Sequence, residues 1–389
     1  MRSGLERFVD NVEGVRGKRV GVACNHTAVD SRLDHLLDRL MAAEVPVRRI
    51  FAPEHGLHAT AQDMVAVDGD DGKQALVSLY GKSVDTLRPR RELLADLDVV
   101  LFDIQDIGSR YYTYQATLGY MMEVAATTGT KIIVLDRPNP IDGLTVEGNV
   151  VLPGYESFVG AYPLAVRHGM TMGELGTYFR DVVGIACALE VVRCDAWDRS
   201  AWFDQTGLPW VFPSPNMPTL DTATIYPGLC LVEGTNVSEG RGTTRPFHLV
   251  GAPWFDANEL CRLCRLGAQD AGLEGVAFRA ACFEPRFQKF AGQPCNGIEI
   301  VVTDRLTLNA LLLGLVVIEA CMRAAPDHFR WRTETYEFVD NPIAIDLLLG
   351  SAEGRVTLES RMSVRDLVDR WSESRPDWDK ARASCLLYP

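Results

Sequence analysis

Residues 99–114 read VVLFDIQDIGSRYYTY, in which a short apolar run stops at a group of polar side chains. Three further runs, at 20–24, 47–52 and 132–135, stop in the same way. Their length and their bounding polar residues are typical of buried strands. Between these runs, segments 31–44, 90–95 and 112–128 favour helices. Alternating strands and helices predict an α/β fold, a Rossmann-like, mostly parallel sheet with helices on both faces.

The ends of these predicted strands carry most of the candidate functional residues. In an open parallel sheet the carboxyl ends of the strands share one edge, and ligands bind in the crevice outside it. We therefore expect the polar residues that follow the four runs to meet in one cleft. No Gly-x-Gly-x-x-Gly motif or Walker-type loop is present, so we expect no nucleotide cofactor.

The second half of the sequence has a different character. Residues 209–242 are rich in Pro, Gly, Asn, Ser and Thr and read as a long functional loop, and a Thr171–Glu174 capping box opens a helix before it. Further on, patterns predict a helix at 257–267, a strand at 297–303, a helix at 306–325 and a last helix that begins at Ser363. We predict a Rossmann-like catalytic domain at 1–225 and a smaller α+β auxiliary domain at 226–389 that contributes a loop to the cleft.

The composition of the chain excludes several classes of partner and cofactor. A net charge of −13 over 389 residues argues against a nucleic-acid or anionic-membrane partner, since a phosphate backbone requires a basic patch. Ten scattered cysteines indicate buried thiols in a reducing compartment, and Cys261 and Cys264 lack the second ligand pair of a zinc site, so we expect no metal. The first residues lack an apolar signal-peptide segment, which predicts a cytoplasmic protein; the oligomeric state stays open.

Glu54, in a Pro-Glu-His-Gly turn, is a candidate general acid, although a lone Glu-His pair is more often a cap or an ion-pair partner. Asp103, Asp106 and Arg110 either serve a ligand or satisfy one another as a buried network. The tyrosines at 111–114 could offer flat faces to a sugar ring or pack in the core. Paired carboxyls with amides and aromatics favour glycosidic bond cleavage, and the arginines indicate a sugar with its own carboxylate.

The chain carries a series of longer motifs in a fixed order: NHT at 25–27, FAPEHGL at 51–57, SLYG at 78–81, the 102–114 segment, LDRPNP at 135–140, RHGMT at 167–171, PSPNMPT at 213–219, EGTNVSEGRGT at 233–243 and LLY at 386–388. With these motifs the chain resembles the NamZ-type exo-β-N-acetylmuramidases, glycoside hydrolases of peptidoglycan turnover. The resemblance spans nearly the whole chain. It implies a hydrolase that releases N-acetylmuramic acid from the non-reducing end of β-1,4-linked peptidoglycan fragments without a cofactor, in cell wall turnover or muropeptide recycling.

The resemblance also implies roles for individual residues. Glu54 would be the general acid, with Asp103 or Asp106 as the second carboxylate and Glu239 in reserve, unless the substrate acetamido group replaces a protein nucleophile. Arg110, Arg137 and Arg241 compete for the lactyl carboxylate. The predicted substrate-binding residues are Asn25, His26, His55, Arg110, Tyr112, Arg137, Asn139, Arg167, His168, Asn216, Glu233, Asn236 and Arg241.

Two other functions fit parts of the sequence. A non-catalytic protein that binds muropeptides or other acidic sugars would need the same arginines and aromatics. A metal-dependent hydrolase is a weaker alternative, in which Asp103, Asp106, His26 and His55 would supply oxygen and nitrogen ligands. Members of the NamZ-type family are often exported, so either a leader has been removed from this chain or the enzyme acts on imported muropeptide fragments.

Overall fold

The N-terminal half is built on a parallel six-stranded sheet, which confirms the predicted fold class. The computed structural model describes residues 1–58, 60–61, 75–81 and 83–389. The strands are β1 (Val20–Cys24), β2 (Val47–Ala52), β3 (Ala75–Ser78), β4 (Val99–Asp103), β5 (Lys131–Leu135) and β8 (Leu189–Val192). They lie in the order β3-β2-β1-β4-β5-β8, and every neighbouring pair is parallel. Successive strands are thus added to one side of β1 as far as β3 and to its other side from β4 onward. Folds of this kind bind ligands at such a switch point, here between β1 and β4.

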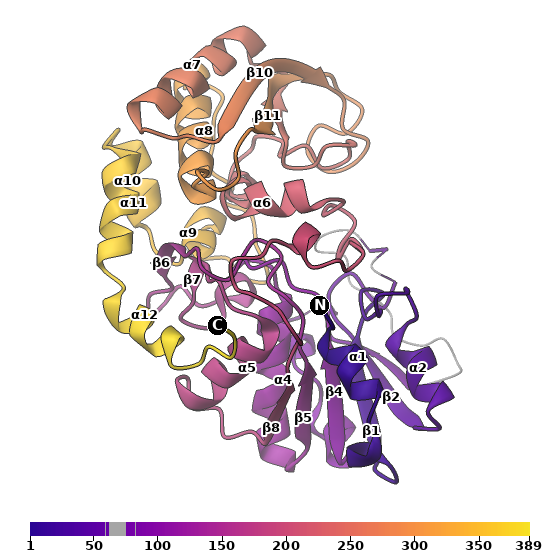
Figure 1. Ribbon diagram of the computed structural model, residues 1–389. Coiled ribbons are helices and arrows are strands. Elements are labelled where there is room, and N and C mark those ends of the chain that lie inside the picture. Colours follow the sequence, from indigo (N-terminus) through magenta and orange to yellow (C-terminus); the bar gives the residue numbers. More distant parts are fainter. Residues whose placement is uncertain (59, 62–74, 82) are drawn as a thin grey trace.

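Helices cover both faces of this sheet (Figure 1). On one face, Val99 and Leu101 of β4 join a buried cluster with residues of α1 (Gly4–Val9) and α2 (Leu36–Ala42). On the other face, Val100 and Phe102 join the main core. The helices α3 (Arg91–Ala95), α4 (Tyr114–Thr128) and α5 (Met172–Asp181) belong to that side. Alternate side chains of one strand thus supply two separate cores.

Most of the predicted elements of this half are confirmed, with one shortened helix. The expected helix 31–44 reaches only from Leu36 to Ala42. Leu33 has a φ of +70°, and Val29 and His35 form a bridge, so the chain turns before α2 begins. The His35 side chain accepts from the backbone N–H of Leu37 and caps the helix. The predicted Thr171–Glu174 capping box is present at the start of α5.

The C-terminal half contains a smaller antiparallel sheet in the order β10-β11-β9. Its strands are β9 (Leu249–Ala252), β10 (Val276–Phe283) and β11 (Cys295–Val302). Helix α7 (Ala257–Asp270) packs on β10 and β11, and α8 (Ala310–Ala324) packs on α7. Four further helices follow: α9 (Ala344–Leu349), α10 (Glu353–Glu359), α11 (Val364–Glu373) and α12 (Pro376–Ala383). In Figure 1 the yellow helices α10, α11 and α12 return along one side, and the C-terminus lies near α5 of the first half.

The expected loop at 209–242 contains a helix that the sequence analysis missed. Helix α6 (Leu220–Leu229) carries Pro227 inside it and is buried on nearly all sides, so it shows no amphipathic period. It packs against α8 so closely that a Cβ on Gly228 would overlap the carbonyl of Ala310. Only glycine allows this approach.

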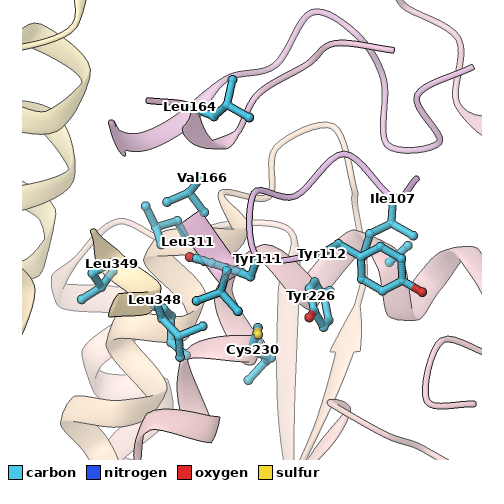
Figure 2. Close-up of a cluster of buried hydrophobic side chains, with 14 of the residues drawn as sticks. Ile107, Tyr111, Tyr112, Leu164, Val166, Tyr226, Cys230, Leu311, Leu348 and Leu349 are labelled. Carbon is cyan, nitrogen blue, oxygen red and sulfur yellow. The ribbon is translucent and has the colours of Figure 1, made fainter. Parts of the chain in front are cut away.

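A continuous apolar core joins the two halves. Figure 2 shows Tyr111, from the turn after β4, lying close to side chains of α8 and α9, among them Leu311 and Leu348. Leu164 and Val166 lie above them; Val166 belongs to β7 (Ala165–Arg167), the partner of β6 (Glu147–Val150). These residues all belong to one buried cluster, so the core continues from one half into the other. Among the helices of the described residues, none combines the length and the apolar character that a membrane span requires.

Candidate active site

A recess lies between the carboxyl edge of the parallel sheet and the C-terminal half. Both halves line it, through turns that follow β2 and β4, through α6 and through two loops of the C-terminal half. The lining residues are Glu54, His55, Tyr111, Tyr112, Thr113, Tyr114, Val159, Ser214, Asn216, Met217, Tyr226, Glu233, Arg241, Phe247, Tyr336 and Glu337.

Glu54 reaches this recess from a tight turn that follows β2. His55 has a φ of +69° and Gly56 one of +81°, and the N–H of Gly56 donates to the carbonyl of Pro53 at 3.0 Å. A left-handed φ at a residue other than glycine costs free energy and is common at functional sites. The Glu54 side chain is only 4% exposed, and its Oε2 accepts a hydrogen bond of 2.6 Å from the hydroxyl of Thr113. The carboxyl group is therefore buried and held in one orientation.

Aromatic side chains form one wall of the recess. Tyr112 meets Tyr114 and Tyr226 edge to face, with ring centroids 4.9 and 5.7 Å apart, and Tyr226 meets Phe247 at 4.9 Å. Burial raises the pKa of Tyr112 and Tyr226 well above 10, so both phenols stay protonated at neutral pH. The wall thus offers flat apolar faces with hydroxyl groups, which suits a sugar ring.

A second charged group lies in the recess on the loop that follows α6. Arg241 Nη2 is 2.6 Å from Oε1 of Glu233, and the hydroxyl of Tyr336 donates to Oε2 of the same glutamate at 2.9 Å. The guanidinium of Arg241 lies over the ring of Phe247, 5.3 Å from its centroid. The recess therefore holds a guanidinium that is fixed by an ion pair and an aromatic face.

Glu337 is a recess residue that the sequence analysis missed. It lies in a turn closed by hydrogen bonds between Tyr336 and Val339, where Glu337 and Phe338 have φ values of +46° and +67°. The hydroxyl of Tyr80, in the SLYG motif after β3, donates to Oε2 of Glu337 at 3.1 Å. No spacing or motif marks Glu337 in the sequence. Its turn lies 257 positions after Tyr80, so only the folded chain brings the two residues together.

The predicted meeting of Glu54 with Asp103, Asp106 and Arg137 differs from the structure. Asp103 and Arg137 form a buried ion pair with two contacts of 2.5 and 3.0 Å, and neither residue lines the recess. Asp106 accepts from the N–H of Gly108 at 2.7 Å and lies 3.6 Å from His168. Asp103 and Arg137 thus satisfy each other, as the alternative of a buried network predicts, whereas Oδ1 of Asp106 is buried without a hydrogen-bond partner among the described residues.

Arg110 and Arg167 also serve the interior. The fully buried guanidinium of Arg110 donates to the carbonyls of Asn149, Leu164 and Leu348, and burial lowers its pKa to about 10. Arg167 forms buried ion pairs at 2.8 Å with Asp142 and at 2.9 Å with Glu147. Both arginines tie backbone segments together, and Arg241 is the arginine that lines the recess among the described residues.

The remaining predicted residues divide between the recess and its surroundings. His55, Tyr112, Asn216, Glu233 and Arg241 line it. Asn25 lies behind the aromatic wall and donates to the hydroxyl of Tyr114 at 3.2 Å, and His26 bonds the carbonyl of Phe212 at 2.6 Å. Asn139 donates to the carbonyl of Met170, His168 accepts from the N–H of Met170, and Asn236 donates to the carbonyl of His328. Glu239 binds Lys289 at 3.0 Å, outside the lining.

A metal site is not seen in the described part of the chain. No group of three or more His, Cys, Asp or Glu side chains is arranged there so that it could hold an ion. The carboxylates of the recess pair instead with a guanidinium or with hydroxyl groups.

A buried carboxyl group beside an aromatic wall, with further carboxylates close by, is the equipment of acid-assisted glycosidic bond cleavage. The fold and this site define a glycoside hydrolase. Two family models match the chain: the N-terminal model of the exo-β-N-acetylmuramidase NamZ over residues 20–221 and the C-terminal model over residues 224–388. The chain therefore belongs to the NamZ family.

Similar proteins support this membership. The chain is 39% identical over 393 residues to the peptidoglycan β-N-acetylmuramidase NamZ of Bacillus subtilis (strain 168). The alignment covers 100% of this chain and 91% of that protein. Two crystal structures of DUF1343 family proteins from Bacteroides fragilis NCTC 9343 have the same fold. The first has a TM-score of 0.87 at 33% identity, and the match covers 100% of this chain and 99% of the matched chain. The second has a TM-score of 0.75 at 26% identity, and the match covers 100% of this chain and 98% of the matched chain. These similarities favour the enzyme over the binding-protein alternative.

Proposed function

We propose that this enzyme removes a terminal N-acetylmuramic acid residue from the non-reducing end of β-1,4-linked peptidoglycan fragments, in wall turnover or muropeptide recycling. The observation that carries the proposal is the presence of Glu54 and Arg241 in one aromatic-walled recess. Glu54 would protonate the leaving oxygen, and the guanidinium would attract the lactyl carboxylate that distinguishes this sugar from N-acetylglucosamine.

The second carboxylate of the reaction is proposed to be Glu337. Glu233 is engaged in the ion pair with Arg241 and in the hydrogen bond from Tyr336, which suits it to hold the arginine in place. Glu337 approaches from the C-terminal half on a strained turn and is oriented by Tyr80. It would orient the 2-acetamido group, whose oxygen attacks the anomeric carbon, or act on the anomeric centre directly.

Two chromogenic substrates test the function. The enzyme is expected to hydrolyse a 4-nitrophenyl β-N-acetylmuraminide and to leave the corresponding β-N-acetylglucosaminide, which lacks the lactyl group, nearly untouched. A reduced disaccharide with muramic acid at the non-reducing end should release that sugar, whereas one with glucosamine at that end should not. Equal turnover of both sugars, or cleavage inside a longer glycan, would contradict the proposal.

A further inference from the structure

A four-residue charge cluster extends from the recess into the interior: Arg241 and Glu233 line the recess, whereas Glu239 and Lys289 lie behind them, outside its lining. Arg241 lies between two glutamates: Nη2 is 2.6 Å from Glu233, whereas Nη1 is 3.8 Å from Glu239. Glu239 is 2% exposed, and its other oxygen is 3.0 Å from Nζ of Lys289. Two acids therefore face one arginine, and the lysine binds the acid that the arginine approaches less closely.

Lys289 is held in place by its own loop. It lies between β10 and β11, and its ammonium group also donates to the carbonyls of Val232 and Val237, at 3.2 and 2.9 Å. The residues on either side of it, Gln288 and Phe290, both have left-handed φ values, +65° and +59°. Each such conformation at a non-glycine residue costs free energy, which is common where a side chain must be aimed.

The charges of this cluster balance only when the lysine is present. Glu233 and Glu239 supply two negative charges, and Arg241 and Lys289 supply two positive ones. Without the ammonium group the cluster would carry one excess negative charge, and the nearby glutamate would attract Arg241 away from the recess. An anionic ligand that approaches Arg241 would then meet repulsion at short range in a poorly solvated site.

We propose that Lys289 is a positioning residue: it binds Glu239 so that Arg241 stays aimed into the recess, and it thereby sets the preference of the site for a sugar that carries a carboxylate. This inference rests on the proposed function. It changes the interpretation of Glu239, which becomes the counter-ion of Lys289 instead of a reserve catalytic carboxylate. Lys289 itself acts through Glu239 and Arg241 and does not line the recess.

The test compares an acidic substrate with an uncharged form of the same sugar. The probes are 4-nitrophenyl β-N-acetylmuraminide and its lactyl methyl ester. In the Lys289→Met variant, KM for the acid should rise about tenfold with kcat changed by less than about threefold, and KM for the ester should change little. Lys289→Arg, which keeps the charge, should stay close to the wild-type enzyme.

A double variant separates charge from loop structure. Lys289→Met combined with Glu239→Gln removes one charge of each sign, so KM for the acid should return to within about twofold of wild type. If Lys289 only ties the loop through its bonds to Val232 and Val237, the second substitution cannot restore it. An equal rise of KM for acid and ester, or no rescue in the double variant, would overturn the inference.

Two further outcomes keep the inference and the proposed function distinct. If Lys289→Met does not fold, Glu239→Gln alone carries the test, because the excess positive charge should lower KM for the acid and leave the ester unaffected. An unchanged KM for the acid in that variant would sink the inference. If the wild-type enzyme hydrolyses no muraminide at all, the proposed function fails instead, irrespective of Lys289.

Discussion

Thr113 occupies the N-cap position of α4, yet its side chain accepts no hydrogen bond from the backbone of that helix; its hydroxyl donates instead to Oε2 of Glu54 at 2.6 Å. The two residues are 59 positions apart and follow β2 and β4, the strands that flank β1. A threonine at this position would ordinarily contribute to helix stability as a cap. Here that contribution is replaced by a fixed orientation of the buried carboxyl group, which is the arrangement that a general acid needs.

Replacement of Glu54 by glutamine should remove the proton donor and leave the fold unchanged, since the amide occupies the same volume. For a disaccharide, whose leaving oxygen needs protonation, we expect kcat to fall by about 100-fold or more. For a 2,4-dinitrophenyl muraminide, whose leaving group departs unprotonated, the loss should be much smaller. Steady-state kinetics with both substrates measure this difference.

Two matched variants complete that experiment. Glu373→Gln, at an exposed position of α11, should retain wild-type rates with both substrates. Glu337→Gln should slow both substrates to a similar extent, because the second carboxylate acts at the anomeric centre and not on the leaving group. A Glu54→Gln enzyme with wild-type turnover of the disaccharide would remove Glu54 from the mechanism.

The sheet and the position of Glu54 at the carboxyl end of β2 could be predicted from the sequence because both depend on local patterns. Short apolar runs between helical segments define the strands, and the Pro-Glu-His-Gly turn places its glutamate at the strand end. The partners of the other strand-end residues could not be predicted in this way. Asp103 and Arg137 form an ion pair that only the folded chain brings together, so a self-satisfied network and a ligand site look alike in the sequence.

The features that the sequence did not predict have physical causes of the same kind. Helix α6 is buried on nearly all sides, so it lacks the amphipathic period by which helices are recognised, and Pro227 reads as a helix breaker. Glu337 and Lys289 reach the site from turns whose left-handed φ values lie at residues other than glycine. Such conformations are imposed by tertiary contacts, so no local pattern marks them.

Arg110 is expected to support the fold and not the substrate, in contrast to the sequence-based prediction. Arg110→Met would leave the carbonyls of Asn149, Leu164 and Leu348 without their donor in the interior. We expect the free energy of unfolding to fall by roughly 3 kcal/mol or more, as buried polar groups lose their partners. Urea denaturation measures the change, and Arg32→Met at an exposed position is the control. A variant of normal stability with a raised KM for muraminide would restore Arg110 as a ligand.

Tyr388 anchors the C-terminal segment to the parallel sheet. Its hydroxyl donates to Oδ2 of Asp136 at 2.5 Å and accepts from the N–H of Cys194 at 2.9 Å. Tyr388→Phe removes both bonds without changing the ring, so we expect a loss of about 1 to 3 kcal/mol of stability. Thermal unfolding of this variant beside Tyr155→Phe, a half-buried tyrosine, shows whether the loss is specific. Equal melting temperatures for the two would argue against an anchoring role.

His26 should make the stability of the protein depend on pH below neutrality. Burial lowers its pKa from the usual 6.5, and the nearby histidines at 58, 35 and 55 act in the same direction. As pH falls through about 6.5, the unfolded chain takes up a proton at this residue that folded His26 resists, so stability is lost on acidification. His26→Gln should therefore show a smaller decrease in unfolding free energy between about pH 7.5 and 5.5 than the wild-type protein, since the carboxylates contribute equally to both. Urea titrations at several pH values give the two slopes, and parallel curves would show that His26 takes up its proton equally well in the folded and unfolded states.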